Sequence, residues 1–295
     1  MQMEGRIVKA LSGYYYVDTG VERITCRARG KFRLDGTSPL VGDRVHVDIS
    51  SDGTGSIREI LPRRNYFIRP AVANIDLLVM LAAAVNPITA PFLIDRVSAL
   101  AAHHSCDFLL CINKTDLDPG DALYSLYSAS GMDVLRTSAV SGEGVDALSK
   151  RLGGRVCAFT GNSGVGKSSL LNALSPELSL LTGAVSEKLG RGRHTTRHVE
   201  LFSLPNGGYV ADTPGFGSFD IEQMESIRPA ELQYCFPEFA PFIGSCRFTD
   251  CTHRSEPDCA VRAAAETGQI PPSRLESYQR LWEQANRKKD WEVGT

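Results

Sequence analysis

The sequence of 295 residues lacks several features that mark specialised classes of protein. No apolar run is long enough to cross a membrane, and the first residues lead into an alternating pattern instead of the apolar core of a secretion signal. The formal net charge is only −2, which argues against a protein that coats nucleic acid over its whole surface. These absences predict a soluble, cytoplasmic protein. Its 42% of hydrophobic residues would suffice for a large core divided into two or three domains.

Cysteine is unevenly distributed. Four of the eight cysteines are scattered, and we expect them to be buried thiols: Cys26, Cys106, Cys111 and Cys157. The others lie close together beside a histidine, which in a chain without a secretion signal favours a metal site over disulfides. The spacing Cys246-x4-Cys251-x-His253-x5-Cys259 supplies three thiolates and one imidazole, a closed tetrahedral set for structural Zn²⁺. Cys235 is a spare thiol that we leave out of this set.

Residues 161–168, GNSGVGKS, have the pattern of a phosphate-binding P-loop between an apolar strand and a helix. The glycines allow successive backbone N–H groups to surround phosphates, and the positive end of the helix points at them. Lys167 would reach the β- and γ-phosphates, and Ser168 would ligate Mg²⁺. The alternative is an ordinary Gly-rich turn, which the flanking elements disfavour. The predicted phosphate-binding set is Gly161, Asn162, Ser163, Gly164, Val165, Gly166, Lys167, Ser168 and Ser169.

A second motif selects the base. Residues 113–116, NKTD, follow an apolar strand at 108–112, and the carboxyl ends of parallel strands are where such sheets bind ligands. The Asp116 carboxylate can accept from both the ring N–H and the amino group of guanine, whereas adenine presents no such donor pair. A backbone N–H after the next strand could meet the guanine carbonyl oxygen. The predicted guanine set is Asn113, Lys114, Thr115, Asp116, Ser138 and Ala139.

Further residues are candidates for the Mg²⁺ shell and for sensing the γ-phosphate. Asp212 ends a predicted strand and offers a carboxylate to Mg²⁺, and the N–H of Gly215 can sense the γ-phosphate. The basic loop 190–198 contains Thr195 and Thr196, one of which would add a hydroxyl to Mg²⁺. The sequence does not choose between them, and our site assignment uses Thr196.

The pattern of elements predicts a multidomain α/β protein. Residues 1–65 alternate as five short strands with turn signals between them, which favours an OB-fold β-barrel. Such barrels often bind RNA through basic and aromatic side chains, although a protein-contact module is the alternative. The candidates are Arg27, Arg29, Lys31, Phe32, Arg33 and the tyrosines at 14–16. Residues 61–70 are expected to be a linker. We predict a doubly wound GTPase domain at 66–221 and a helical zinc-binding domain at 222–295.

The order of the motifs is unusual because NKTD and Ser138-Ala139 precede the P-loop, so the GTPase domain looks circularly permuted. With the barrel and the C-terminal Cys/His cluster, the chain resembles the RsgA (YjeQ) family of bacterial GTPases associated with the small ribosomal subunit. The resemblance covers nearly the whole chain. It implies late maturation of that subunit, rRNA contact near the decoding region, GTP hydrolysis stimulated by the subunit, and release on hydrolysis. We also expect a monomer.

The position after Gly215 is Phe216, where many GTPases have a polar residue that orients the attacking water. An apolar ring cannot do this, so either the basic loop or the ribosome must supply the missing group. The predicted catalytic set is His194, Lys167 and Gly215. His194 is the candidate for orienting the water, because imidazole can hydrogen-bond a water near neutral pH. A solvated loop histidine is the alternative.

Two other classes of function compete with a ribosome-directed GTPase. One is a small-molecule kinase, which the guanine motif at 113–116 disfavours. The other is a binding module in which nucleotide only regulates docking, with little turnover.

Overall fold

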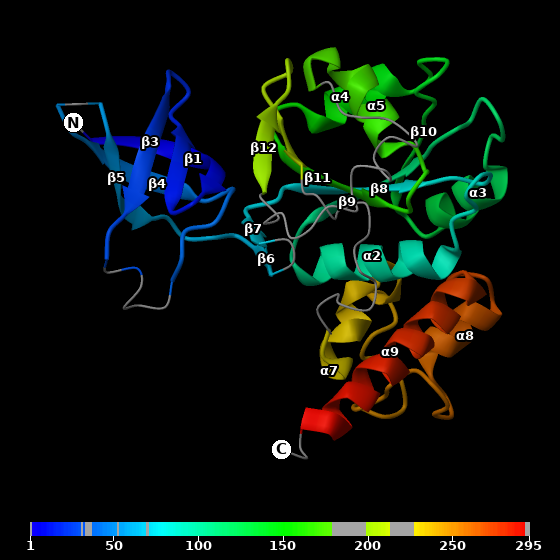
Figure 1. Cartoon of the computed structure of the whole chain (residues 1–295). Coiled ribbons are helices and arrows are strands. Elements are labelled where there is room, and N and C mark those ends of the chain that lie inside the picture. Colours follow the sequence, from blue (N-terminus) through cyan, green and yellow to red (C-terminus); the bar gives the residue numbers. More distant parts are fainter. Residues whose placement is uncertain are drawn as a thin grey trace.

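The computed structural model describes residues 2–30, 32, 37–51, 53–68, 71–178, 199–212 and 227–292, except for the side chains of Asp212 and residues 288–292. The barrel, the central sheet and the C-terminal helices form three successive parts, with the two ends of the chain in the first and the last (Figure 1). No helix in the described part of the chain is long and apolar enough to span a membrane.

The N-terminal part is a closed five-stranded barrel, as predicted. Its strands pair in the order β1–β2–β3–β5–β4, and β4 returns to β1. Every pairing is antiparallel except that between β3 and β5. The inward residues of the alternating pattern, such as Ile7, Val45 and Ile57, are fully buried. The strands are β1 (Gln2–Leu11), β2 (Tyr14–Asp18), β3 (Arg23–Ala28), β4 (Arg44–Ile49) and β5 (Gly55–Ile60).

The structure corrects part of the predicted RNA-contact set on the barrel. Phe32 is only 7% exposed and belongs to the same hydrophobic cluster as the inward residues of the barrel. Tyr15 and Tyr16 also pack against this core, which leaves Tyr14 as the exposed tyrosine of the three. Lys31 and Arg33 lie outside the described residues.

The expected linker at 61–70 includes the short strand β6 (Tyr66–Ile68), which pairs with β7 (Ala71–Ala73) directly after it; Phe67 and Val72 of this ribbon are buried. It is fixed to the barrel because Arg63 forms two hydrogen bonds, of 2.7 and 2.8 Å, with the buried carboxylate of Asp43. The sequence of this segment predicted a linker, but it gave no sign of this distant ion pair.

The central domain is a six-stranded sheet in the order β10-β9-β8-β11-β13-β12, parallel except for β12. Helix α2 covers one face, and α4 and α5 cover the other (Figure 1). The continuous apolar strand β8 alternates between the two cores: Leu78 and Met80 lie in the core with α2, and Leu77 and Val79 in the core with α4 and α5. Its elements are β8 (Leu77–Ala82), α2 (Pro91–His103), β9 (Asp107–Ile112), α3 (Asp121–Ala129), β10 (Asp133–Arg136), α4 (Val145–Leu152), β11 (Val156–Gly161), α5 (Lys167–Leu174), η1 (Pro176–Leu178), β12 (Glu200–Ser203) and β13 (Tyr209–Asp212).

The barrel and the central sheet meet at the edge strand β12. Strand β1 pairs with β12 at Lys9 and Glu200, whose side chains form an ion pair at 2.6 Å. The Tyr209 hydroxyl of β13 donates a hydrogen bond to Asp18 Oδ2 of the barrel at 3.1 Å. The sheets therefore continue into each other, which the strand patterns did not predict.

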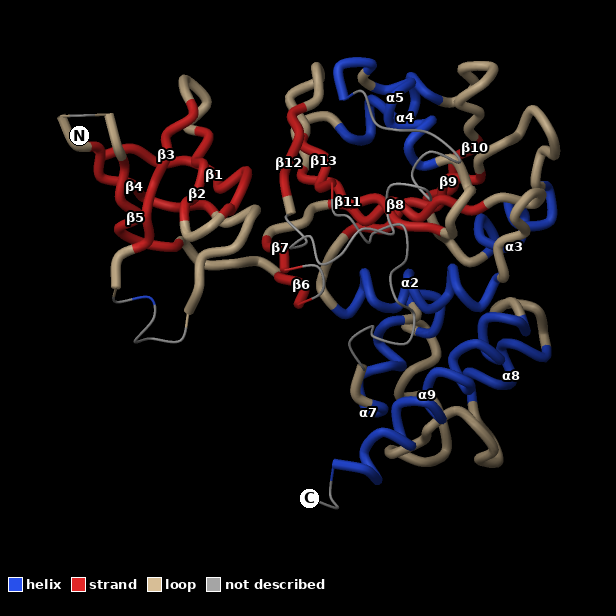
Figure 2. Tube along the Cα trace, in the orientation of Figure 1, coloured by secondary structure: helices blue, strands red, loops and turns tan. Residues whose placement is uncertain are grey.

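The C-terminal part is a small helical unit packed against α2 (Figure 2). The last helix buries one apolar face: Tyr278 and Ala285 are buried, and Leu275, Leu281 and Trp282 pack against the same core. The elements are α7 (Pro229–Leu232), η4 (Gln233–Cys235), η5 (Pro237–Phe239), α8 (Ala260–Glu266) and α9 (Pro272–Glu292).

A buried ion cluster joins this unit to the central domain. Arg274 of α9 is fully buried, and its guanidinium bonds to Asp95 of α2 at 2.8 Å and to Glu238 of η5 at 2.5 Å. The Tyr127 hydroxyl donates to the same Asp95 oxygen at 2.9 Å. Because the arginine has two acidic partners, removing it would leave two buried carboxylates without their counter-charge.

We expect Arg274→Ala to lower the free energy of unfolding of the C-terminal unit by about 3–5 kcal/mol, the usual cost of breaking a buried ion pair. The chain has two tryptophans, Trp282 and Trp291, both within α9, so tryptophan fluorescence during denaturant unfolding reports on this unit. The control is Arg228→Ala, because Arg228 forms an exposed ion pair with Glu231, and the loss of an exposed pair should change the free energy of unfolding far less than the loss of a buried one. Equal losses for both variants would contradict the proposed anchoring role of Arg274.

Candidate nucleotide-binding site and metal centre

The P-loop connects β11 to α5 through glycines in left-handed backbone conformations. Gly164 has φ of +78° and Gly166 has φ of +100°. A Cβ atom at Gly166 would lie 2.4 Å from the side-chain nitrogen of Asn113, so the loop can approach that residue only with glycine at this position. Gly161 ends β11, Val165 is fully buried, and Ser168 lies in the first turn of α5. The predicted loop geometry is therefore present.

Lys167 begins α5 and its ammonium group bends back over the loop. The Nζ atom donates to the carbonyl oxygens of Gly161 at 2.6 Å and Asn162 at 3.1 Å. Burial lowers the pKa of Lys167 from 10.5 to about 8. Phosphate oxygens placed in the loop would supply the negative charge that this half-buried ammonium lacks.

The base-recognition loop lies against the P-loop. Asn113 is buried and donates from Nδ2 to the carbonyl oxygen of Val165 at 2.8 Å. Its Oδ1 accepts from the Thr137 hydroxyl at 3.2 Å. The Asp116 carboxylate accepts from the Ser138 hydroxyl at 2.5 Å. The structure therefore brings together the loops that follow β9, β10 and β11, and with them the predicted phosphate and guanine residues.

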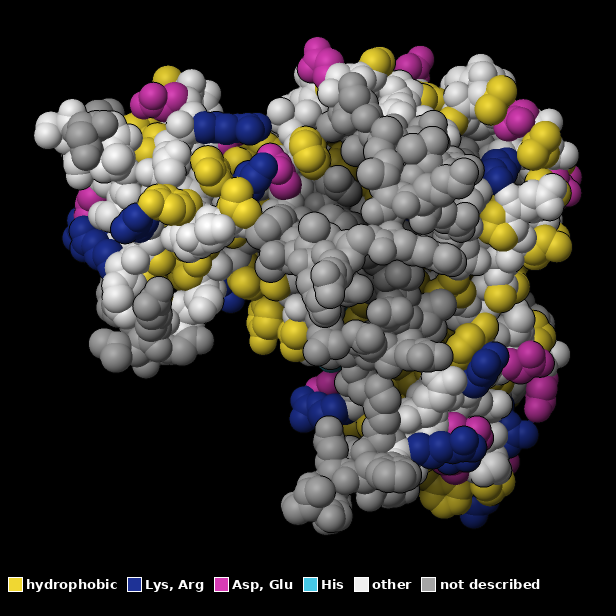
Figure 3. Space-filling model, viewed as in Figure 1, with side chains coloured by type: hydrophobic (Ala, Val, Ile, Leu, Met, Phe, Trp, Pro, Cys, Tyr) yellow, Lys and Arg dark blue, Asp and Glu magenta, His cyan; other side chains and the backbone are white. Residues whose placement is uncertain are grey.

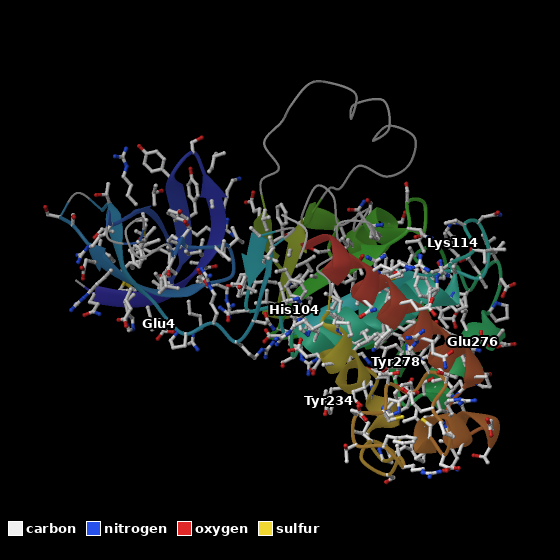
Figure 4. The ribbon with its side chains drawn as sticks, turned by 90° about the horizontal axis from the view of Figure 1, so that it is seen from below. Glu4, His104, Lys114, Tyr234, Glu276 and Tyr278 are labelled. Carbon is white, nitrogen blue, oxygen red and sulfur yellow. The ribbon has the colours of Figure 1, made fainter. Side chains whose placement is uncertain are left out.

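Two residues outside the predicted motifs also contact this site. The Lys114 ammonium donates to the main-chain oxygen of Asn86, in the loop after β8. The Thr115 hydroxyl donates to the Glu143 carboxylate at 2.6 Å. A main-chain acceptor leaves no trace in the residue type, so sequence reasoning had no signal for Asn86. Lys114 lies at the end of the domain remote from Glu4 of the barrel (Figure 4).

Several predicted catalytic and magnesium residues are not placed by the structure. His194, Thr195, Thr196, Gly215 and Phe216 lie outside the described residues. Asp212 ends β13, which runs parallel to β11, so its backbone lies at the same edge of the sheet as the P-loop. Its side chain is not among those described, and its role as a magnesium ligand stays a prediction.

The predicted metal ligands converge in the C-terminal unit. One donor atom from each of Cys246, Cys251, His253 and Cys259 lies within 4.8 Å of the others. His253 turns Nδ1 toward Cys259 Sγ at 3.4 Å, and its Nε2 lies 2.9 Å from Gln233 Oε1, which fixes the ring. Burial raises the pKa of the Cys251 thiol to about 12, so a bound cation would be needed to hold it as a thiolate.

The spare thiol is also explained. Cys235 is buried, and its Sγ donates to the carbonyl oxygen of Glu231 in the preceding helix α7 at 3.6 Å. It does not belong to the group of donors that could hold a metal.

The lowered pKa of Lys167 predicts proton uptake when a nucleotide binds. The free lysine is charged below about pH 8 and loses its proton above, whereas phosphate keeps it charged to higher pH, so affinity is full below pH 8 and falls as the pH rises. Calorimetric GDP titrations in buffers of different ionisation enthalpy give the number of protons taken up, and the difference from Lys167→Arg removes the contribution of the nucleotide's own phosphate. This difference should be about half a proton at pH 8 and almost none at pH 6.5. Equal uptake at both pH values would contradict the shifted pKa.

The comparisons with known proteins cover both the barrel and the nucleotide site. The RsgA N-terminal domain model matches residues 4–57, and the RsgA GTPase model matches residues 60–222. The chain is 43% identical over 290 residues to the small ribosomal subunit biogenesis GTPase RsgA of Caldanaerobacter subterraneus subsp. tengcongensis, covering 97% of each chain. It is 44% identical to the protein of the same name from Bacillus anthracis, over 97% of this chain and 98% of the relative.

Two solved structures are similar over almost the full length. YjeQ from Thermotoga maritima matches with a TM-score of 0.83 and 34% identity, over 97% of this chain and 99% of that one. YloQ, described as a circularly permuted GTPase, matches with a TM-score of 0.80 and 36% identity, over 98% of this chain and 96% of that one. The motif order, the fold and these relatives agree, and the chain belongs to the RsgA GTPase family.

Proposed function

We propose that this GTPase hydrolyses GTP to GDP and phosphate while bound to the small ribosomal subunit, assists late maturation of that subunit, and dissociates on hydrolysis. The observation that carries the proposal is the bond from Asn113 to Val165, which joins a P-loop to a guanine motif in a chain similar over 97% of its length to small ribosomal subunit biogenesis GTPases.

The proposed chemistry is a magnesium-assisted attack of water on the γ-phosphate. Lys167 and the P-loop N–H groups neutralise phosphate charge, and Asp116 selects guanine. Mg²⁺ would be held by Ser168, Asp212 and Thr196, and the bound ion would stabilise the negative charge on the β- and γ-phosphates. Gly215 would contact the γ-phosphate. His194 is our candidate for orienting the water, with a group of the ribosome as the alternative.

We propose that the barrel contacts rRNA near the decoding region. Its visible face carries Lys and Arg side chains interleaved with hydrophobic ones (Figure 3). Tyr14 is 37% exposed, and the Arg27 guanidinium lies 4.6 Å from the centre of its ring. Paired cationic and aromatic groups of this kind stack on unpaired bases. Across residues 1–70 there are 12 Lys and Arg against 8 Asp and Glu, a local excess of +4 in a chain of net charge −2.

We propose one structural Zn²⁺ at Cys246, Cys251, His253 and Cys259. A tetrahedral site with Zn–S bonds of about 2.3 Å has ligand-to-ligand distances of about 3.8 Å. The sulfur atoms of Cys246 and Cys259 are 3.8 Å apart, so the donors are already close to that geometry. We also expect the protein to act as a cytoplasmic monomer.

Removing the metal should unfold the C-terminal unit and leave GDP binding largely intact, because that unit packs against α2, whereas the P-loop helix α5 covers the other face of the sheet. Cys259→Ser should reduce the zinc content to less than one ion per chain and change the tryptophan fluorescence. Cys235→Ser should retain one zinc ion per chain. Zinc is measured by atomic emission and GDP affinity by calorimetry. A folded C-terminal unit in the metal-free protein would contradict the structural role.

The central prediction is GTP turnover that purified small ribosomal subunits raise by at least about a hundredfold. ATP in place of GTP, and large subunits in place of small ones, are the matched controls and should give no stimulation. Turnover without stimulation would favour a metabolic enzyme, and negligible turnover throughout would favour a regulatory binding module.

The same assay tests the proposed catalytic histidine. Replacing His194 with Ala should lower the stimulated rate by about a hundredfold while GTP affinity is retained, because a positioned general base or water-orienting group contributes on this scale. An unchanged stimulated rate would assign the water-orienting role to the ribosome.

A further inference from the structure

The turn that presents Asp116 to the base has a strained backbone. Lys114 has a φ of +65°, in the left-handed region that residues with a side chain rarely adopt. Such a conformation persists only where neighbouring contacts hold it in place. The Asn113 and Lys114 side chains supply contacts on one side of the turn, to Val165 and Asn86.

Thr115 holds the other side of this turn. Its backbone N–H donates to the carbonyl oxygen of Thr137 at 3.3 Å, a long bond, and its hydroxyl lies 3.1 Å from the same oxygen. The shortest contact of Thr115 is the 2.6 Å hydrogen bond from its hydroxyl to Glu143 Oε2. The acceptor is a carboxylate, which makes stronger hydrogen bonds than a neutral oxygen.

The loop that carries Glu143 is itself rigidly built. The main-chain oxygen of Glu143 accepts a hydrogen bond from the N–H of Ser138 at 2.9 Å. The N–H of Gly142 donates to the main-chain oxygen of Ser138, also at 2.9 Å. Gly144 has φ of +69°, and a Cβ atom there would lie 1.9 Å from the carbonyl oxygen of Arg136. Ser138, which bonds to Asp116, and Glu143, which bonds to Thr115, therefore belong to one closed loop.

We propose that Glu143 is a positioning residue for guanine recognition, acting through Thr115 on the orientation of Asp116. The proposal rests on the proposed function, in which Asp116 binds the base. Glu143 fixes the residue beside Asp116, and Ser138 of the same loop fixes Asp116 itself. The Asp116 carboxylate, whose two oxygens would accept from the ring N–H and the amino group of guanine, is thereby held by one loop, directly through Ser138 and indirectly through Thr115.

The test compares GDP with inosine diphosphate, which lacks the exocyclic amino group that Asp116 would accept from. Glu143→Ala should weaken GDP binding by about fivefold, the value of one net hydrogen bond, and weaken binding of the inosine analogue by less. Thr115→Val should have the same effect, and the double variant should lose no more than either single variant because they break one bond. Glu143→Gln keeps an acceptor oxygen and should stay within about twofold of the natural protein.

The control is Asp146→Ala, which removes another exposed carboxylate three residues further on and should leave both affinities unchanged. Equal weakening of both nucleotides by Glu143→Ala, or no weakening of either, would overturn the positioning role, because a general structural defect does not distinguish the two bases. Asp116→Asn separates the two proposals. If it weakens GDP strongly while Glu143→Ala has no effect, only the role of Glu143 is lost; if it has no effect, base recognition by Asp116 is lost as well.

Discussion

The hydrogen bond from Asn113 to the carbonyl oxygen of Val165 joins the phosphate-binding and base-recognition loops, and the geometry of the nucleotide site depends on it. It forms because Gly166 has no side chain to occupy the space that the Asn113 amide fills. Thr137 extends the link to a third loop by donating to the other end of the same amide. Since the amide is buried, breaking either bond leaves a polar group unpaired away from water, so the loops are held at fixed distances before any ligand arrives.

The two outer parts of the chain attach to the central domain by contacts of different kinds. The barrel meets the β12 edge through strand pairing, the partly exposed ion pair of Lys9 with Glu200 and one tyrosine hydrogen bond. The buried apolar residues of the barrel also belong to the same hydrophobic cluster as those between the central sheet and α2. The C-terminal unit instead has a separate hydrophobic core, to which α2 contributes Ala99, and it inserts the buried Arg274 between acidic groups of α2 and η5. The barrel therefore shares its apolar core with the central domain, whereas a buried ion cluster joins the C-terminal unit to α2.

The permuted order of the chain changes which segments connect the barrel, the central domain and the C-terminal unit. The strand order of the sheet is set by the loops that must meet at one edge. Strand β12 leads to β13, which ends at Asp212 beside the P-loop strand, and β12 is also the strand on which the barrel docks. One short hairpin therefore adjoins both the barrel and the nucleotide edge. The metal ligands lie apart from this edge, in a region where η4 supplies Gln233 to orient His253.

Much of this protein was determined by its sequence alone. The alternating strands predicted the barrel, and the P-loop, the NKTD motif and the Cys/His spacing predicted their sites, because each is a local pattern with a local physical reason. Tertiary structure decided what depends on residues far apart: that Phe32 turns inward, that Arg63 fixes the expected linker to Asp43, that β1 continues the central sheet, and that Glu143 reaches Thr115. No local pattern encodes these contacts, since their partners meet only when the chain has folded.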